Sequence, residues 1–198
     1  MEAGERKYAI HPSSIMMVLI LSGITTLFGA LTFAYLYSRA DRGMNSITVP
    51  WLFVVNTFIL AGAGICIHRF RNSFQHKHEK PAIRWGMYTL LATLLFLCMQ
   101  ALAWYQLFST QIIPGTSGGY AYLYAISILH FLHVAAGIPF LVRLLIPLYS
   151  AERDGSIALL FIDDHLQRKL QHTTWYWHFI DVVWIYLVVF FLISSLIG

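Results

Sequence analysis

The chain carries no aspartate, glutamate, lysine or arginine between Arg84 and Arg143. This interval is mainly apolar, and its one cluster of turn-forming residues is the segment Pro114–Gly119. A transmembrane helix needs about 20 mainly apolar residues, so the interval has room for two such helices joined by a turn. Soluble domains contain about 25% charged residues, whereas this chain of 198 residues contains 11%. We therefore predict an integral membrane protein.

Three further apolar segments bring the predicted number of transmembrane helices to five. We expect an all-α bundle of five transmembrane helices that forms a single membrane domain over residues 1–198. The connection before the last helix contains a candidate interfacial helix at Ile157–Leu170, in which the apolar residues precede the charged ones. The predicted spans cover about residues 15–38, 51–67, 85–108, 120–141 and 175–197.

Lysine and arginine are distributed unequally between the two sides of this bundle. Eleven of the 13 fall on the side that contains the N-terminus, and only Arg39 and Arg42 fall on the other side. Positively charged residues are enriched in cytoplasmic loops. We therefore expect the N-terminus to be cytoplasmic and the C-terminus to lie outside.

Four polar side chains lie within the last two predicted spans. His178 and Asp181 are three residues apart, as are His130 and His133 in the preceding span. Residues at this spacing share one helix face. An aspartate at the centre of a transmembrane helix costs about 2.5–3.5 kcal/mol on insertion scales, so it is retained only with a partner or a task. Because Asp181 and His133 fall at similar depths in antiparallel helices, we expect a histidine of the fourth span to contact the His178/Asp181 face.

The sequence leaves three interpretations of these residues open. They form hydrogen bonds between helices, take part in proton relay or substrate binding, or ligate a haem or metal. A di-haem bundle needs histidine pairs at two depths, whereas these histidines cluster at one, so the first interpretation is favoured. Cys66 and Cys98 lack metal-binding spacing and are expected to be free thiols. The expected polar core between helices comprises His130, His133, His178, Asp181, Trp177, Trp184, Gln100 and Asn56.

Basic and aromatic residues mark the expected cytoplasmic edge of the last span. Arg168 and Lys169 come just before it, and Trp175 begins it. Basic residues at this level attract anionic headgroups, and tryptophan is enriched at the membrane interface. We expect these three residues to contact lipid headgroups.

The residues from Trp175 to Trp184 read Trp-Tyr-Trp-His-Phe-Ile-Asp-Val-Val-Trp. This string closely resembles the last-helix signature of subunit III of the haem-copper cytochrome c oxidases. The resemblance covers the chain from Pro12 to its end, and further matching segments occur in the family's order. They are Val55–Thr57 with Gly64, Met99–Ala101 with Trp104, and His130–Gly137, which is similar to the family's His-x-x-His-Val-x-x-Gly motif.

The resemblance implies the short, five-helix form of a family whose long members have seven helices. In long members, the two additional helices form a V-shaped cleft with the others, in which lipids bind. Here that cleft is expected to be absent or completed by another subunit. Because the family's haems and copper lie in subunits I and II, the resemblance implies no catalytic residue, metal or cofactor on this chain, apart from bound phospholipid.

The implied role is that of an accessory subunit of a cytochrome c oxidase in aerobic electron transport. Such a subunit packs on subunit I and supports assembly, proton uptake and sustained turnover. The implied location is the bacterial cytoplasmic membrane, with the other oxidase subunits and membrane lipids as partners, and no nucleic acid. Two alternatives stay open: the equivalent subunit of a quinol oxidase or nitric oxide reductase, and a stand-alone membrane haem-binding or proton-coupled carrier protein.

The sequence departs from the family pattern at several polar positions. Two positions that are glutamate in the family align with Gly23 and Ala103 of this chain. A pair of histidines of the family aligns with Arg71 and Asn72. Roles that depend on those groups are therefore not expected here. Asp181 is the only acidic residue in the five predicted spans, which weakens the proton-relay interpretation.

Overall fold

The computed structural model of the chain describes residues 12–42, 47–115, 117–155 and 157–196. Arg6 and Lys7 of the charge count, Thr116 of the predicted turn and Ile197 of the last predicted span lie outside the described residues. The helices are α1 (Pro12–Arg42), α2 (Trp51–Gln75), α3 (Glu79–Ser109), α4 (Gly118–Arg153), the short α5 (Ile157–Leu160) and α6 (Asp164–Leu196). All except α5 are long and apolar enough to cross a membrane. The prediction of an all-α integral membrane protein with five long apolar helices is confirmed.

The long helices continue beyond the predicted spans. α2 ends at Gln75 rather than near residue 67, α4 ends at Arg153 rather than near residue 141, and α6 begins at Asp164 rather than near residue 175. Charged residues set the edge of the hydrocarbon region, but the backbone hydrogen bonds of a helix continue into the polar region beyond it. The predicted spans therefore located the apolar part of each helix and not its ends.

The interfacial helix expected at Ile157–Leu170 is not formed as one element. Its first residues form α5, and the residues from Asp164 onward belong to α6. Asp163 explains this division, because its Oδ1 atom accepts a hydrogen bond from the backbone N–H of His165 at 2.8 Å. An aspartate in this position caps a helix, and the acidic Asp164 in the first turn interacts favourably with the helix dipole.

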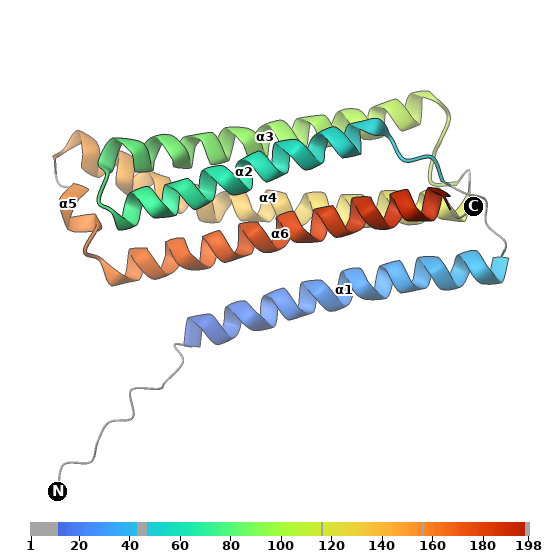
Figure 1. Cartoon of the computed structure of the whole chain (residues 1–198), viewed down its shortest axis with the longest axis horizontal. Coiled ribbons are helices and arrows are strands. Elements are labelled where there is room, and N and C mark those ends of the chain that lie inside the picture. The colour runs from blue at the N-terminus through green and yellow to red at the C-terminus, as the bar shows by residue number, and fades with distance from the viewer. Residues whose placement is uncertain (1–11, 43–46, 116, 156, 197–198) are drawn as a thin grey trace, which may run out of the picture.

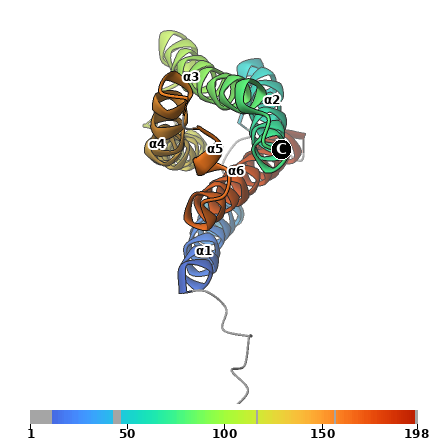
Figure 2. The ribbon, with the colours of Figure 1, turned by 90° about the vertical axis from the view of Figure 1, so that its left-hand side faces the viewer.

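Helices α2, α3, α4 and α6 form a ring in which each helix contacts the next, and α1 packs outside the ring against α4 and α6. Figure 1 shows α1 on the opposite side of α6 from α2. The end view in Figure 2 shows the same order, from α3 and α2 through α4 and α6 to α1. α6 therefore has two different flanks, one toward α2 and one toward α1.

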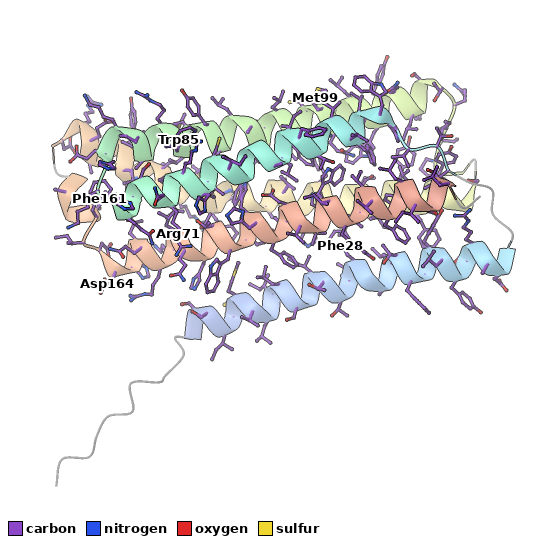
Figure 3. All side chains as sticks on the ribbon, viewed as in Figure 1. Phe28, Arg71, Trp85, Met99, Phe161 and Asp164 are labelled. Atoms are coloured by element: carbon purple, nitrogen blue, oxygen red, sulfur yellow. The ribbon has the colours of Figure 1, made fainter. Side chains whose placement is uncertain are left out.

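Two groups of buried apolar side chains fill the bundle. The first lies toward the N-terminal end of α2 and includes Phe28, Phe53, Phe96 and Trp184. In this group the ring of Trp184 lies 5.4 Å from that of Phe53 and 5.3 Å from that of Phe96. Figure 3 shows Phe28 between α1 and the ring of helices. The second group lies at the opposite end, near the turn between α2 and α3, and includes Phe70, Phe74, Leu144, Leu148 and Trp177.

Candidate functional site

One hydrogen bond between two buried amide side chains joins α2 and α3. Asn56 Nδ2 donates to Gln100 Oε1 at 2.8 Å, and both residues are fully buried. The sequence predicted each of these residues in a polar core between helices, without predicting that they contact each other. Asn56 Oδ1 and Gln100 Nε2 have no hydrogen-bond partner among the described residues.

His130 lies at the centre of the ring of helices and is 1% exposed. Its ring packs on Trp184 of α6 with 4.8 Å between ring centroids, and it lies 6.0 Å from the ring of Phe96 of α3. On the α1 side, it lies 6.2 Å from the ring of Phe28. Neither ring nitrogen of His130, nor Nε1 of Trp184, is hydrogen bonded to a described residue. His130 therefore connects four helices through ring packing.

His133 is partly exposed and lies toward α1. Its Nδ1 atom donates to the backbone carbonyl of Leu129 at 2.7 Å, and its ring is 5.6 Å from that of Phe28. Tyr176 of α6 donates its hydroxyl to the backbone carbonyl of His133 at 2.9 Å. The imidazole is thus bonded within its own helix, while the backbone of His133 joins α4 to α6.

Asp181 is seated against the backbone of α2. A Cβ atom on Gly64 would overlap Asp181 Oδ2, so the absence of a side chain at Gly64 makes room for the carboxylate. Asp181 is 8% exposed, and its Oδ2 atom lies 3.9 Å from Nδ1 of His178 on the same helix. The ring of His178 lies 6.2 Å from that of His68 on α2. Asp181 Oδ1 is buried and has no hydrogen-bond partner among the described residues.

No hydrogen bond joins a histidine of the fourth span to the His178/Asp181 face among the described residues, because neither ring nitrogen of His130 is bonded and Nδ1 of His133 bonds within its own helix. Asp181 lies against Gly64 of α2, and Trp184, about one turn further along α6, packs on His130 of α4 as well as on Phe53 of α2. The expectation of a contact between the histidine and this face compared depths only. Depth carries no information on the rotation of α6 about its own axis, and this rotation decides which neighbour each side chain meets.

Trp177 packs on α4 through a second glycine. A Cβ atom on Gly137 would lie 2.9 Å from the ring of Trp177, so the tryptophan occupies the space that a side chain would fill. Small residues permit close approach of transmembrane helices. In this bundle, Gly64 and Gly137 each receive a specific side chain of α6.

A cleft of about 570 Å³ lies between α1, α4 and α6. Its walls are mostly apolar and include Met16, Ile20 and Phe140, but Arg143 and Lys169 line it as well. Lys169 was predicted to contact a lipid headgroup, whereas Arg143 was missed. The signal was present in the sequence, because Arg143 is the first charged residue after the long uncharged interval.

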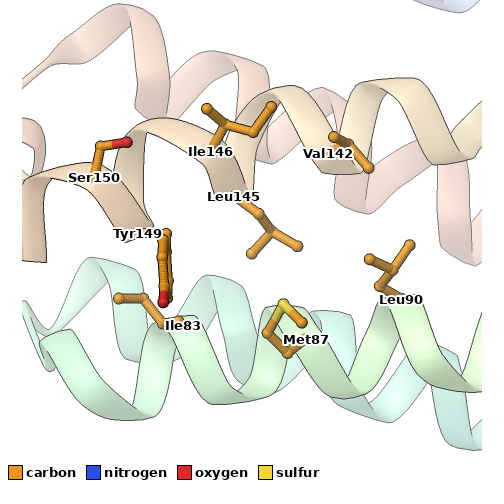
Figure 4. Close-up of a pocket in the computed structure, with 8 residues that line it drawn as sticks. All are labelled: Ile83, Met87, Leu90, Val142, Leu145, Ile146, Tyr149 and Ser150. Atoms are coloured by element: carbon orange, nitrogen blue, oxygen red, sulfur yellow. The ribbon is translucent and has the colours of Figure 1, made fainter. Parts of the chain in front are cut away.

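The other two residues predicted at lipid headgroups lie outside this cleft. Arg168 is exposed, and Trp175 is exposed with its ring 5.9 Å from that of His172, which does line the cleft. A second cleft of about 490 Å³ lies between α3 and α4. Figure 4 shows its apolar lining, with Leu90 and Met87 of α3 facing Leu145 and Val142 of α4.

The family model for cytochrome c oxidase subunit III matches residues 16–195. The chain belongs to the cytochrome c oxidase subunit III family. It is 31% identical over 146 residues to cytochrome c oxidase subunit 3 of Tachyglossus aculeatus aculeatus, an alignment that covers 74% of this chain and 50% of that protein. It is 32% identical over 150 residues to the Xenopus laevis protein of the same name, covering 74% of this chain and 50% of the relative. The chain thus spans about half the length of the curated relatives it matches.

Membership of the subunit III family confirms the resemblance carried by the Trp175–Trp184 string. In the structure, this subunit III string directs its side chains to three different helices. Trp177 packs on α4, Asp181 packs on α2, and Trp184 packs on rings from α4, α2 and α3. A run that serves three contacts within about three helical turns has little freedom to change, because each residue is fitted to a different neighbour.

The described part of this subunit III chain contains no group of three or more histidine, cysteine, aspartate or glutamate side chains that could hold a metal ion. Cys66 and Cys98 are free thiols, as predicted. The polar groups of the bundle are therefore arranged in pairs and single positions between helices.

Proposed function

We propose that this chain is the accessory, non-catalytic subunit III of a haem-copper cytochrome c oxidase. In this proposal it packs on subunit I and supports assembly, proton uptake and sustained turnover in aerobic electron transport. The observation that carries the proposal is the family match over residues 16–195, which spans all five long helices. Haem and copper then belong to partner subunits, and this chain contributes a bundle with polar groups at its helix contacts.

The polar residues between the helices have a structural role in this proposal. Asn56 with Gln100, His130 with Trp184, and Asp181 at Gly64 each fit one helix to another at a fixed register. Hydrogen bonds between transmembrane helices contribute about 0.6–2 kcal/mol each, and close approach at small residues adds van der Waals contact. The buried Trp177 completes the proposed polar core of the bundle, and the partly exposed His133 and His178 lie at its edge.

We further propose that the single membrane domain lies in the bacterial cytoplasmic membrane with its N-terminus in the cytoplasm. The unequal distribution of lysine and arginine supports this orientation. Single-cysteine variants at Lys77 and Gln111, in a chain in which Cys66 and Cys98 are replaced by serine, test it with a membrane-impermeant thiol reagent. Labelling at 111 and protection at 77 in intact cells is expected, and the reverse pattern rejects the orientation.

Lipid binding is the second part of the proposed role. The cleft between α1, α4 and α6 has apolar walls beside Arg143 and Lys169, a combination that suits the acyl chains and phosphate of a phospholipid. Arg168 and Trp175 would then contact headgroups nearby on the outer surface. Mass spectrometry of the complex should detect less anionic phospholipid in an Arg143→Gln/Lys169→Gln variant than in an Arg84→Gln/Lys80→Gln control.

Purification of the tagged chain from its native membrane in mild detergent tests the proposed function directly. Haem- and copper-containing subunits are expected to co-purify with the chain. After these subunits are dissociated, the isolated chain is expected to show no haem absorbance. A chain that purifies alone and carries its own haem spectrum would be a stand-alone cytochrome, and the proposal would fail.

A further inference from the structure

The outward surface where α2 meets α6 carries imidazole groups among apolar side chains. We call the residues Ile65, His68, Trp175, His178 and Val182 the α2–α6 face. Ile65 is 57% exposed, Val182 is 63% exposed, and the side chain of His178 is 43% exposed. Because His68 and His178 have ring centroids 6.2 Å apart, the outward surfaces of the two helices are continuous at this level.

This face lies on the apolar part of α6 and at the edge of the apolar part of α2, where His68 directly precedes Arg69. His178 is nine residues beyond Lys169, or about 14 Å along the helix at 1.5 Å per residue. Asp181 and Gly64, which contact each other, lie about one turn deeper than His178 and His68. Apolar Ile65 and Val182 flank the imidazoles on this surface.

The outward surfaces of α1 and α3 differ from this face. On α1, the exposed hydroxyls of Thr25 and Thr26 donate to carbonyls of their own helix at 2.9 Å and 3.0 Å. On α3, the outward residues include Leu91, Leu95 and Leu102, which are more than half exposed and purely apolar. These positions suit lipid chains, because they present no polar group that needs an external partner. Exposed tyrosines lie elsewhere on both helices, namely Tyr37 on α1 and Tyr88 and Tyr105 on α3.

The α2–α6 face does present polar groups that need an external partner. Among the described residues, no hydrogen-bond partner is found for the imidazoles of His68 and His178, which lie next to each other, with the Asp181 carboxylate 3.9 Å from His178. Asp181 Oδ1 is buried behind them without a hydrogen bond to a described residue. Arg71 adds a positive charge about one turn beyond His68 (Figure 3). The outermost groups of this face are therefore two imidazoles, each with at least one N–H donor, and the Arg71 cation, with one buried carboxylate behind them.

We infer that the α2–α6 face is the surface on which a transmembrane helix of another oxidase subunit docks, and that this helix presents a carboxyl or amide oxygen to His178 and His68. The inference rests on the proposed function, since it requires a partner chain in the membrane. An acceptor on the partner is complementary to the exposed donors, and the surrounding Ile65 and Val182 supply apolar contact on either side. A histidine left facing hydrocarbon without such a partner is costly.

Site-specific photocrosslinking in the assembled complex tests this inference. A photoreactive phenylalanine analogue is placed at Ile65 or Val182, and at Leu91 of α3 as the control. Leu91 matches Ile65 in depth, because the Asn56–Gln100 bond and the Arg69–Trp85 contact align α2 with α3. It also matches in exposure, at 56% against 57%.

Crosslinks from positions 65 and 182 to a second protein chain, and crosslinks from position 91 to lipid only, are the expected result. Crosslinks to protein from position 91 alone, or to lipid from all three positions, overturn the inference. If no haem- or copper-containing subunit co-purifies with the unmodified chain, it is the proposed function that fails. The two failures are therefore distinguishable.

A pair of substitutions at His178 tests the stated chemistry of the partner. His178→Leu removes the hydrogen-bonding group, whereas His178→Gln keeps a donor of similar size. We expect the leucine variant to retain roughly 3- to 30-fold less partner subunit through detergent washes, and the glutamine variant to retain most of it. Equal retention by both variants shows that the imidazole makes no bond to the partner, and overturns the inference.

Discussion

The two flanks of α6 differ in how their polar groups are satisfied. On the flank toward α1, polar side chains are paired within the chain. Thr32 Oγ1 lies 2.8 Å from Tyr186 Oη, and Tyr35 Oη lies 2.6 Å from Ser194 Oγ. Arg39 Nη1 donates to the backbone carbonyl of Ser194 at 2.6 Å, where the helix ends and its carbonyls lack partners. These bonds hold α1, the outermost helix, on the bundle.

On the flank toward α2, polar groups are fitted by shape but are not fully hydrogen bonded. Asp181 sits against Gly64, yet its Oδ1 atom has no hydrogen-bond partner among the described residues. His178 remains half-exposed at the surface. In hydrocarbon, a polar group without a hydrogen-bond partner is costly. The flank toward α2 is therefore the one at which we infer that another molecule supplies the missing partner. Polar groups within the membrane therefore identify an interface only where the chain leaves them unpaired at its surface.

Substitution of Gly64 breaks the α2 flank and has the largest expected effect. Gly64→Val places a side chain where the Asp181 carboxylate lies, and we expect the free energy of unfolding to fall by about 3 kcal/mol. Denaturation of the purified chain in mixed micelles measures this change. Gly62→Val is the matched control, because a Cβ atom on Gly62 has nothing within 4 Å. If the two variants are equally stable, the contact between Gly64 and Asp181 does not hold α2 to α6.

Asp181→Asn sharpens the comparison by removing the charge and keeping the shape. Because the carboxylate has few bonds within the chain, we expect the free energy of unfolding of the isolated chain to change by less than about 1 kcal/mol. The amount of co-purifying partner should fall about tenfold, which corresponds to about 1.4 kcal/mol.

Thr32→Val on the α1 flank is the control for Asp181→Asn, and the opposite pattern is expected. The chain should lose about 1 kcal/mol of stability with the loss of the bond to Tyr186, while partner recovery stays unchanged. If Thr32→Val reduces partner recovery more than Asp181→Asn does, the assignment of the two flanks is reversed.

Much of the fold followed from the sequence, because the uncharged intervals determine where helices can cross a membrane. The number of long helices, their order and the free cysteines were predicted from residue types alone. The helix ends were not predicted, since Asp163 caps α6 well outside the apolar segment. A charged residue marks the edge of the hydrocarbon region, whereas a cap marks the end of a helix, and these two positions differ.

The sequence predicted which residues belong to the candidate site, but it did not predict which of them contact each other. Spacing placed His178 and Asp181 on one helix face, and the same argument placed His130 and His133 together. Neither argument specifies which helix each face meets, and no hydrogen bond joins the two groups among the described residues. Two glycines account for the rotation of α6 about its axis. The space left by the missing side chain of Gly64 holds Asp181, and the space at Gly137 holds Trp177.

The amide pair between α2 and α3 gives a reference for a fully buried polar contact that is joined by one hydrogen bond. We expect Asn56→Leu and Gln100→Leu each to lower the free energy of unfolding by about 1.5 kcal/mol, because each leaves the other amide without its partner. The double variant should be less destabilised than the sum of the two, with a coupling of about 1 kcal/mol in a double-mutant cycle. Additive effects would show that the 2.8 Å bond contributes nothing to stability.

The smallest effect is expected at the hydroxyl pair on the α1 flank, between Tyr35 and Ser194. Tyr35→Phe removes one hydroxyl and keeps the ring, which packs edge-on against those of Tyr122 and Phe190. A cycle with Ser194→Ala should give a coupling of about 0.6 kcal/mol, the average for hydrogen bonds between transmembrane helices. Tyr37→Phe, at an exposed position two residues along, is the control and should leave stability unchanged. If the coupling is zero while partner recovery falls, Tyr35 and Ser194 act at an interface, and the α1 flank is not completed within the chain.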